Sequence, residues 1–244
     1  MCIRDRPITI SVVPAISAAL AKRDRDSARN TMESSIKVTT LFALPAGMGL
    51  CVMSYPIFNV LYPGSNENGP TLLAILGIAS VFVCIQLITN AILQASGYEK
   101  LALLSLPLGG AIKIIANWFM VGTKALNIVG APIGTLLCYV FITGFNIYFI
   151  KRCLRNPPRF IKTLAKPAIC TLLMALTAFS VYGIFGNAFG LASSGFGMLL
   201  SMAVAILAAI VVYGVSVVAT GAITKDDMQF VPKGEKLARI LKLK

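Results

Sequence analysis

The sequence predicts an all-α, polytopic membrane protein with about six transmembrane helices, and two observations carry this prediction. Hydrophobic residues make up 57% of the 244 residues and charged residues only 13%, whereas a soluble domain carries about 25% charged residues. The apolar residues also gather in segments of about 20 residues. This is the length that an α-helix needs to cross a hydrocarbon layer of about 30 Å.

The basic residues provide an independent check on the number of spans. The tracts at 22–37, 151–166 and 225–244 hold five, six and six Lys or Arg residues and Lys100 adds one, whereas the loops between these tracts hold only Lys124. By the positive-inside rule, this alternation predicts an even number of crossings, both termini in the cytoplasm, and a multi-pass protein of the cell membrane. The net charge of +13 is thus a topology signal, and we expect no nucleic-acid partner.

The first part of the chain combines different compositions. Residues 1–6 (MCIRDR) lack the apolar region of a signal peptide, and we expect them to be a non-native scar; the alternative is a genuine short amphipathic N-terminus. Residues 7–35 are interpreted as the end of a truncated transmembrane helix followed by a polar cytoplasmic segment. The first complete span is predicted at 36–62, where Pro45 is expected to kink the helix because proline frees a backbone carbonyl.

Five further apolar segments follow. Spans are predicted at 71–95, 101–121 and 128–150, so that residues 36–150 hold four transmembrane helices. The segment 151–166 is interpreted as a basic cytoplasmic linker, because its Pro157-Pro158 pair forbids a continuous helix. The last two transmembrane helices are predicted within 167–222, and residues 223–244 form a basic cytoplasmic tail that can lie on an anionic leaflet.

One charged residue lies in the middle of an apolar segment. Lys113 shares a helix face with Asn117, four residues later, and follows Gly109 and Gly110, which permit close packing, and Pro107, which is expected to bend the helix. A charge near the centre of a bilayer costs about 2.5–3.5 kcal/mol on insertion scales. The segment therefore predicts that Lys113 and Asn117 face a water-filled substrate cavity rather than lipid.

A second polar stripe lies in the span at 71–95. Gln86, Asn90 and Gln94 recur at intervals of four residues, so they follow one face of the helix. Amides of this kind can line a cavity for phosphate or sugar hydroxyls, or they can join neighbouring helices through hydrogen bonds. The sequence leaves both interpretations open.

The groups that support catalysis are missing from the spans. The chain has no histidine, and none of its nine acidic residues falls within a predicted span. Its six cysteines have no metal-ligand spacing, so neither a metal nor a cofactor is expected. A membrane-embedded glycosyl- or acyltransferase would need an acidic or histidine constellation, and only Asp226 and Asp227 lie near a membrane face, where helix capping is the simpler role.

Several motifs resemble a known family. They are ILQASGYEK, LGGAIKIIANWFMV, NIVGAPIGTLLCYVFITGFNIYFIKR and ATGAITKDDMQFVPKG, together with the run from Val12 to Gly64. The chain resembles the polysaccharide-biosynthesis and stage V sporulation protein B family of bacteria. This family belongs with the MurJ-like lipid II flippases in the multidrug/oligosaccharidyl-lipid/polysaccharide (MOP) exporter superfamily.

The resemblance implies a function and a missing partner. Members have two lobes of helices around a central cavity, so this chain would supply the C-terminal lobe and two extra helices, and would lack the N-terminal lobe. The implied function is to flip a lipid-linked oligosaccharide, such as a peptidoglycan precursor of the cell wall, by alternating access, with membrane lipids around the tail. Lys113 and Asn117 match the family pattern in their helix.

Two other functions stay open at this stage. A multidrug or cation antiporter of the same superfamily would use carboxylates inside the membrane, and the predicted spans contain none. A non-transporting membrane fragment would keep the fold and show no flux. We expect that this polypeptide alone does not flip lipid, because a cavity between two lobes needs both lobes.

Overall fold

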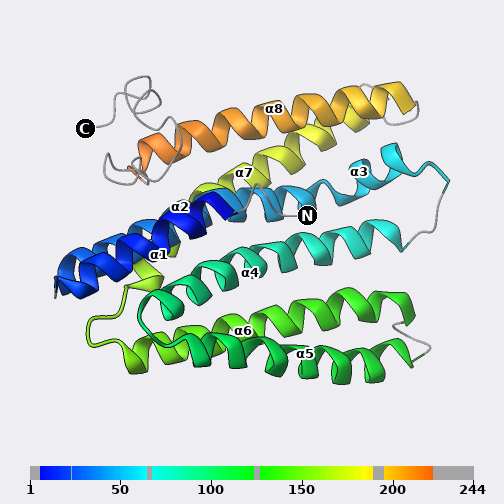
Figure 1. Cartoon of the computed structure of the whole chain (residues 1–244). Coiled ribbons are helices and arrows are strands. Elements are labelled where there is room, and N and C mark those ends of the chain that lie inside the picture. Colours follow the sequence, from blue (N-terminus) through cyan, green and yellow to red (C-terminus); the bar gives the residue numbers. More distant parts are fainter. Residues whose placement is uncertain (1–5, 23, 65–67, 124–126, 189–194, 222–244) are drawn as a thin grey trace.

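A computed structural model describes residues 6–22, 24–64, 68–123, 127–188 and 195–221, and in these ranges the regular structure is helical (Figure 1). The elements are α1 (Arg6–Ala21), α2 (Arg25–Val52), α3 (Ser54–Leu61), α4 (Gly69–Ala95), α5 (Glu99–Val121), η1 (Asn127–Val129), α6 (Gly130–Cys153), α7 (Phe160–Ala188) and α8 (Gly195–Ala219). Six of them, α2 and α4 to α8, are long and apolar enough to cross a membrane. The prediction of an all-α, polytopic membrane protein is confirmed.

The six long helices pack as a row. Their main contacts follow the order α8, α7, α2, α4, α6 and α5, which is the order from top to bottom in Figure 1. The helix α1 packs on α2 and α4, and α3 packs on α4 and α8. The largest apolar cluster joins α1, α2, α4, α5, α6 and α7 around Met32, Ile92 and Ile150. This cluster lies at one end of the helices along their axes. We call this end the basic end, since the arginine-rich start of α2 and the segment after α6 both lie there.

The outer helices of the row present apolar side chains. Trp118 of α5 is 80% exposed and Leu207 of α8 is 64% exposed. These side chains suit a hydrocarbon solvent, in which backbone groups stay bonded within each helix.

The break in the first span lies at Met53 and not at Pro45. The helix α2 is continuous through Pro45, and α3 begins at Ser54. Pro56 lacks the N–H that would bond the carbonyl of Val52, and its ring clashes with that carbonyl in a continuous helix. The expected kink at Pro45 stays a prediction, and the end of α2 at Val52 is a separate feature that the sequence analysis did not predict.

Pro45 is accompanied by a contact between α2 and α8. A proline at this position removes the hydrogen bond to the carbonyl of Leu41, four residues earlier. The hydroxyl of Tyr213, on α8, donates a hydrogen bond to this carbonyl at 2.6 Å. The side chains of Leu41, Tyr213, Cys170 and Val217 pack together around this bond. A neighbouring helix therefore replaces the bond that proline removed, as membrane interiors require.

Two glycines bring α2 and α4 into close contact. A Cβ on Gly47 would lie 2.6 Å from the carbonyl oxygen of Gly77, and a Cβ on Gly77 would lie 2.8 Å from the carbonyl oxygen of Gly47. Only glycine fits at both positions without a shift of backbone, so this pair sets the distance between the two central helices.

A tight turn joins α4 to α5. Gly97 has a φ of 84°, its N–H bonds the carbonyl of Gln94 at 3.0 Å, and the N–H of Tyr98 bonds the carbonyl of Leu93 at 2.9 Å. These two bonds form a Schellman motif, which favours glycine because of its positive φ. The turn lets α5 begin at Glu99.

Some predicted boundaries differ from the structure. The linker between α6 and α7 is limited to residues 154–159, because α6 extends to Cys153 and α7 begins at Phe160, two residues after the proline pair. The polar segment before the first span is helical from Arg25 onward and continuous with that span. The predicted scar lies almost wholly outside the described residues, and the basic tail, with Asp226 and Asp227, lies outside them entirely.

Candidate functional site

The helices α5 and α6 pack antiparallel, and the residues through which they touch are spaced by multiples of four positions along each helix. A Cβ on Gly109 would overlap Ile142, and it would lie 3.2 Å from the sulfur of Cys138. Two turns further along α5, the Oδ1 atom of Asn117 occupies the space where a Cβ on Gly134 would stand. The small residues thus let large side chains of the partner helix approach the backbone.

Lys113 lies between these two contacts. It is half-buried, and its ammonium group is close enough to the thiol of Cys138 to interact with it electrostatically. Within the described ranges it forms no hydrogen bond and no ion pair. The structure therefore places a cation, with no counterion among the described residues, at the junction of two membrane helices, where a bound anion would gain a strong electrostatic partner.

Asn117 packs its side-chain oxygen against α6. Its Oδ1 atom is buried beside the backbone of Gly134 and has no hydrogen-bond partner among the residues that the structure describes. Asn117 thus shares the junction of α5 and α6 with Lys113, and its oxygen remains an unused acceptor.

The polar stripe of α4 divides into three environments. Gln86 is 4% exposed, Asn90 is 8% exposed, and Gln94 is exposed at the far end of the stripe. Asn90 accepts a hydrogen bond from Nδ2 of Asn146 at 2.7 Å and one from Oγ of Ser105 at 3.5 Å. Both hydrogen bonds engage the Oδ1 atom of Asn90 and join α4 to the two neighbouring helices.

Asn146 is the centre of this contact. It is fully buried on α6, and its Nδ2 also donates to Oγ1 of Thr89 at 3.2 Å, while its Oδ1 has no partner in the described part of the chain. The cluster of Thr89, Asn90, Ser105 and Asn146, which we call the amide cluster, joins α4, α5 and α6. Sequence reasoning missed it, although a lone asparagine in the apolar run at 128–150 is the signal that could have found it.

We predict that Asn146→Leu lowers the free energy of unfolding by about 1 kcal/mol, because it removes two of the side-chain hydrogen bonds that join α6 to α4. The measurement is the unfolding midpoint in detergent micelles. Thr135→Val is the matched control, since Thr135 bonds only the carbonyl of Ala131 in its own helix. Equal midpoints for the two variants would contradict the prediction.

The remaining predicted positions lie as follows. A Cβ on Gly110 would meet nothing within 4 Å, so the space at Gly110 is open, unlike that at Gly109. Pro107 is exposed within a helix that runs without a break from Glu99 to Val121. No group of three or more His, Cys, Asp or Glu residues in the described part of the chain could hold a metal ion.

Comparison with known proteins places the chain in one family. The family model for the lipid II flippase MurJ matches residues 7–200. The chain is 24% identical over 237 residues to the uncharacterized membrane protein YabM of Bacillus subtilis (strain 168), covering 96% of this chain and 43% of that protein. It is 26% identical over 147 residues to the lipid II flippase MurJ of the same organism, covering 59% of this chain and 26% of that protein.

Solved structures show the same fold. A MOP superfamily transporter from Pyrococcus furiosus has a TM-score of 0.55 at 15% identity, covering 98% of this chain and 58% of that one. An inward-facing multidrug transporter of the MATE family has a TM-score of 0.52 at 16% identity, covering 98% of this chain and 60% of that one. The chain thus spans less than half the length of the curated relatives and about 60% of the solved ones. The family model matches most of this chain, over residues 7–200, and the chain therefore belongs to the lipid II flippase MurJ family.

Proposed function

We propose that the chain forms the C-terminal half of a flippase for a lipid-linked glycan, a polyprenyl-diphosphate sugar such as a peptidoglycan precursor. The observation that carries the proposal is Lys113, which is half-buried in an apolar helix with no anionic partner among the described residues. A cation in this position costs free energy unless it meets an anion or water. The diphosphate of the substrate supplies such an anion.

The proposed mechanism is alternating access between two lobes. The polar head group crosses in a cavity between the lobes, and the polyprenyl tail stays in lipid beside the apolar outer helices. A cavity that offers an ammonium group and amides replaces part of the hydration of the head group. No covalent bond of the substrate changes, so the chain needs no acid, base or cofactor for this step.

The proposal includes a second lobe and an orientation. The chain matches only 43% of the length of YabM, which leaves room in the whole protein for a further lobe. The basic end carries the arginines of α2 and of the segment after α6, and by the positive-inside rule it faces the cytoplasm of a bacterial cell. Both termini of the chain then lie on that side of the cell membrane.

The test begins at the native locus, upstream of the codon for Pro7. We expect the reading frame to continue there through further apolar segments. The restored protein is then placed in vesicles with a fluorescent polyprenyl-diphosphate glycan, and the fraction of glycan that an external quencher reaches is followed with time. We expect flipping with the restored protein and none with the present chain alone.

Each other outcome contradicts a distinct part of the proposal. A frame that truly starts at Met1 would remove the second lobe. Flipping by the present chain alone would show that one lobe is enough. Transport of a cationic dye without movement of the glycan lipid would replace the flippase by the antiporter alternative.

A further inference from the structure

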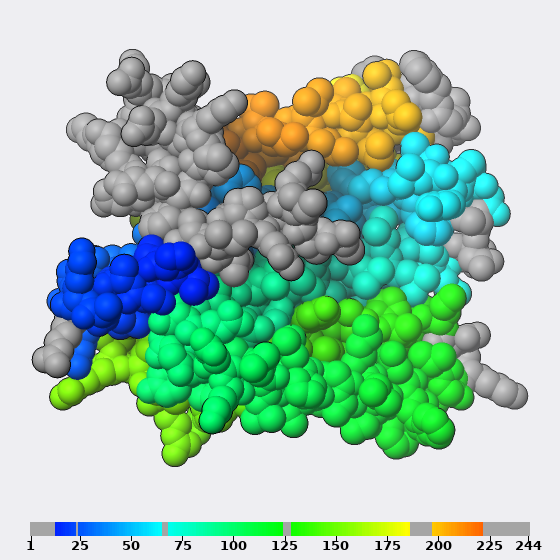
Figure 2. Space-filling model, viewed as in Figure 1, coloured from blue at the N-terminus to red at the C-terminus, as the bar shows by residue number. Residues whose placement is uncertain are grey.

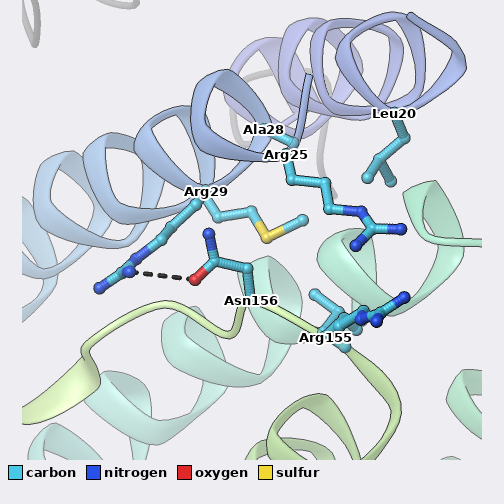
Figure 3. Close-up of a pocket in the computed structure, with 8 residues that line it drawn as sticks. Leu20, Arg25, Ala28, Arg29, Arg155 and Asn156 are labelled. Carbon is cyan, nitrogen blue, oxygen red and sulfur yellow. Dashed lines mark hydrogen bonds between the residues drawn. The ribbon is translucent and has the colours of Figure 1, made fainter. Parts of the chain in front are cut away.

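A pocket of about 70 Å³ lies at the basic end, far from Lys113 in the sequence (Figure 3). It is formed where the start of α2 meets the segment after α6, and Figure 2 shows these two parts, in blue and yellow-green, at the same end of the molecule. Its walls are basic and apolar: three arginines, Arg25, Arg29 and Arg155, stand beside Met32 and Leu154, and no lining residue is acidic.

The three arginines differ in their partners. Nη1 of Arg29 donates to Oδ1 of Asn156 at 3.0 Å, and its Nε pairs with Glu33 at 2.9 Å. Arg25 and Arg155 form no hydrogen bond and no ion pair with any residue that the structure describes. Figure 3 shows their guanidinium groups on the same side of the pocket, while Arg29 turns to the opposite side. Two like charges held on one side of a pocket repel each other unless an anion lies between them.

The segment that carries Arg155 is fixed to α2. Asn156 accepts from Arg29, and its Nδ2 donates to Oδ1 of Asp26 at 3.0 Å. The side chain of Asn156 therefore bridges two residues of α2, three positions apart. Arg155 directly precedes Asn156, so this bridge fixes the backbone of Arg155 against the start of α2, which carries Arg25, before any ligand binds. A site that is already ordered lowers the entropy cost of binding.

The nearby carboxylates are already engaged. The carboxylate of Glu33 accepts from Arg29 and from the backbone N–H of Arg159 at 3.0 Å. Partial burial raises the pKa of Glu33, but these hydrogen bonds outweigh burial and hold the pKa below its ordinary value of 4.5. Asp24 caps α2 by accepting from the N–H of Ser27 at 3.0 Å. Both carboxylates are therefore committed to donors of the chain itself.

We propose that this arginine pocket binds a phosphate group. A cavity of about 70 Å³ holds roughly five water-sized atoms, which is the size of phosphate. Arginine forks match phosphate oxygens in geometry and charge. The apolar side chains beside them suit the glycerol and first methylenes of a lipid. The phosphate therefore comes from a phospholipid head group at the membrane surface or from a soluble phosphate ion, and the test separates these sources.

The experiment uses the whole chain in an uncharged maltoside detergent. In one arm, the unfolding temperature is measured with rising inorganic phosphate at constant ionic strength. In the other, the unfolding temperature is compared after phosphatidylglycerol or phosphatidylcholine is added to the detergent micelles. We expect Arg25→Gln and Arg155→Gln each to weaken the binding of the true ligand about 10-fold, because each loses one charge-assisted contact.

The control must remove the same charge without touching the pocket. Arg152→Gln does so, since Arg152 is exposed like Arg25 and Arg155 but does not line the pocket, and it donates to the hydroxyl of Tyr148 at 3.0 Å. Arg155→Lys keeps the charge but removes the planar guanidinium group that can donate two parallel hydrogen bonds. We expect this variant to lose less binding affinity than Arg155→Gln. A phosphate response alone identifies a soluble ligand, and a phosphatidylglycerol response alone identifies a lipid.

Two results would overturn the proposal: no binding in either arm, or an equal loss for Arg152→Gln and the two pocket variants, which would indicate a general surface-charge effect. The assay measures binding without translocation. Its failure therefore leaves the proposed flippase function untouched, and failure of the flippase test leaves the phosphate pocket untouched.

Discussion

Tyr213→Phe lowers the free energy of unfolding by about 2 kcal/mol in our expectation, a large effect for the loss of one oxygen atom. The hydroxyl of Tyr213 donates at 2.6 Å to the carbonyl of Leu41, which Pro45 deprives of its bond within the helix. Without the hydroxyl, this carbonyl stays unsatisfied inside the membrane region, at a cost of about 1–3 kcal/mol. The measurement is the unfolding midpoint in micelles.

A double-mutant cycle tests the cause. Pro45→Ala restores an N–H that can bond the carbonyl of Leu41 within α2. In that background we expect Tyr213→Phe to cost well under 1 kcal/mol, because the carbonyl has a second donor. Thr177→Val is a control, since the hydroxyl of Thr177 bonds carbonyls of its own helix only. Equal costs for Tyr213→Phe in both backgrounds would show that the tyrosine acts through packing rather than through this bond.

Lys113→Met is the second variant with a large expected effect, here on transport. If the ammonium group meets the diphosphate of the substrate, its loss removes about 2 kcal/mol of attraction and slows flipping by about 30-fold. Methionine keeps the length of the side chain and removes the charge. The measurement is the initial flipping rate of the restored protein in vesicles, normalised to the amount of folded protein.

The same variant separates transport from structure. An unpaired charge in an apolar helix destabilises the folded protein in the membrane, so Lys113→Met is expected to raise the unfolding midpoint while it lowers the rate. Lys100→Met is the control, because Lys100 is exposed in the first turn of the same helix. A transport rate for Lys113→Met that matches this control would rule out contact between Lys113 and the substrate.

The sequence was sufficient for features that depend on one helix at a time. The six spans follow from length and hydropathy, the stop after α6 follows from the Pro157-Pro158 pair, and Lys113 is conspicuous because its neighbours are apolar. These signals are local, so they need no knowledge of which helices touch.

Features that depend on neighbouring helices could not be predicted in this way. The partners of Asn90 and of the Leu41 carbonyl lie 56 and 172 positions away. Pro45 and Pro56 look alike in the sequence, and only the contact with Tyr213 explains how α2 tolerates the first of them. The sequence analysis did not predict the arginine pocket, because the positive-inside rule already explains basic tracts next to spans and gives no information about a binding site.

The order of the helices in the row has a consequence for the way the chain assembles during synthesis. The largest partner of α4 on one side is α6, whereas α5, which is made first, packs mainly on α6. A growing chain that has completed α5 therefore exposes the amide of Asn90 and the face of Lys113 without their final neighbours. The hydrogen bond from Asn146 to Asn90 can therefore form only after α6 has been synthesised, so the final contacts on this side of the protein depend on the later of the two helices.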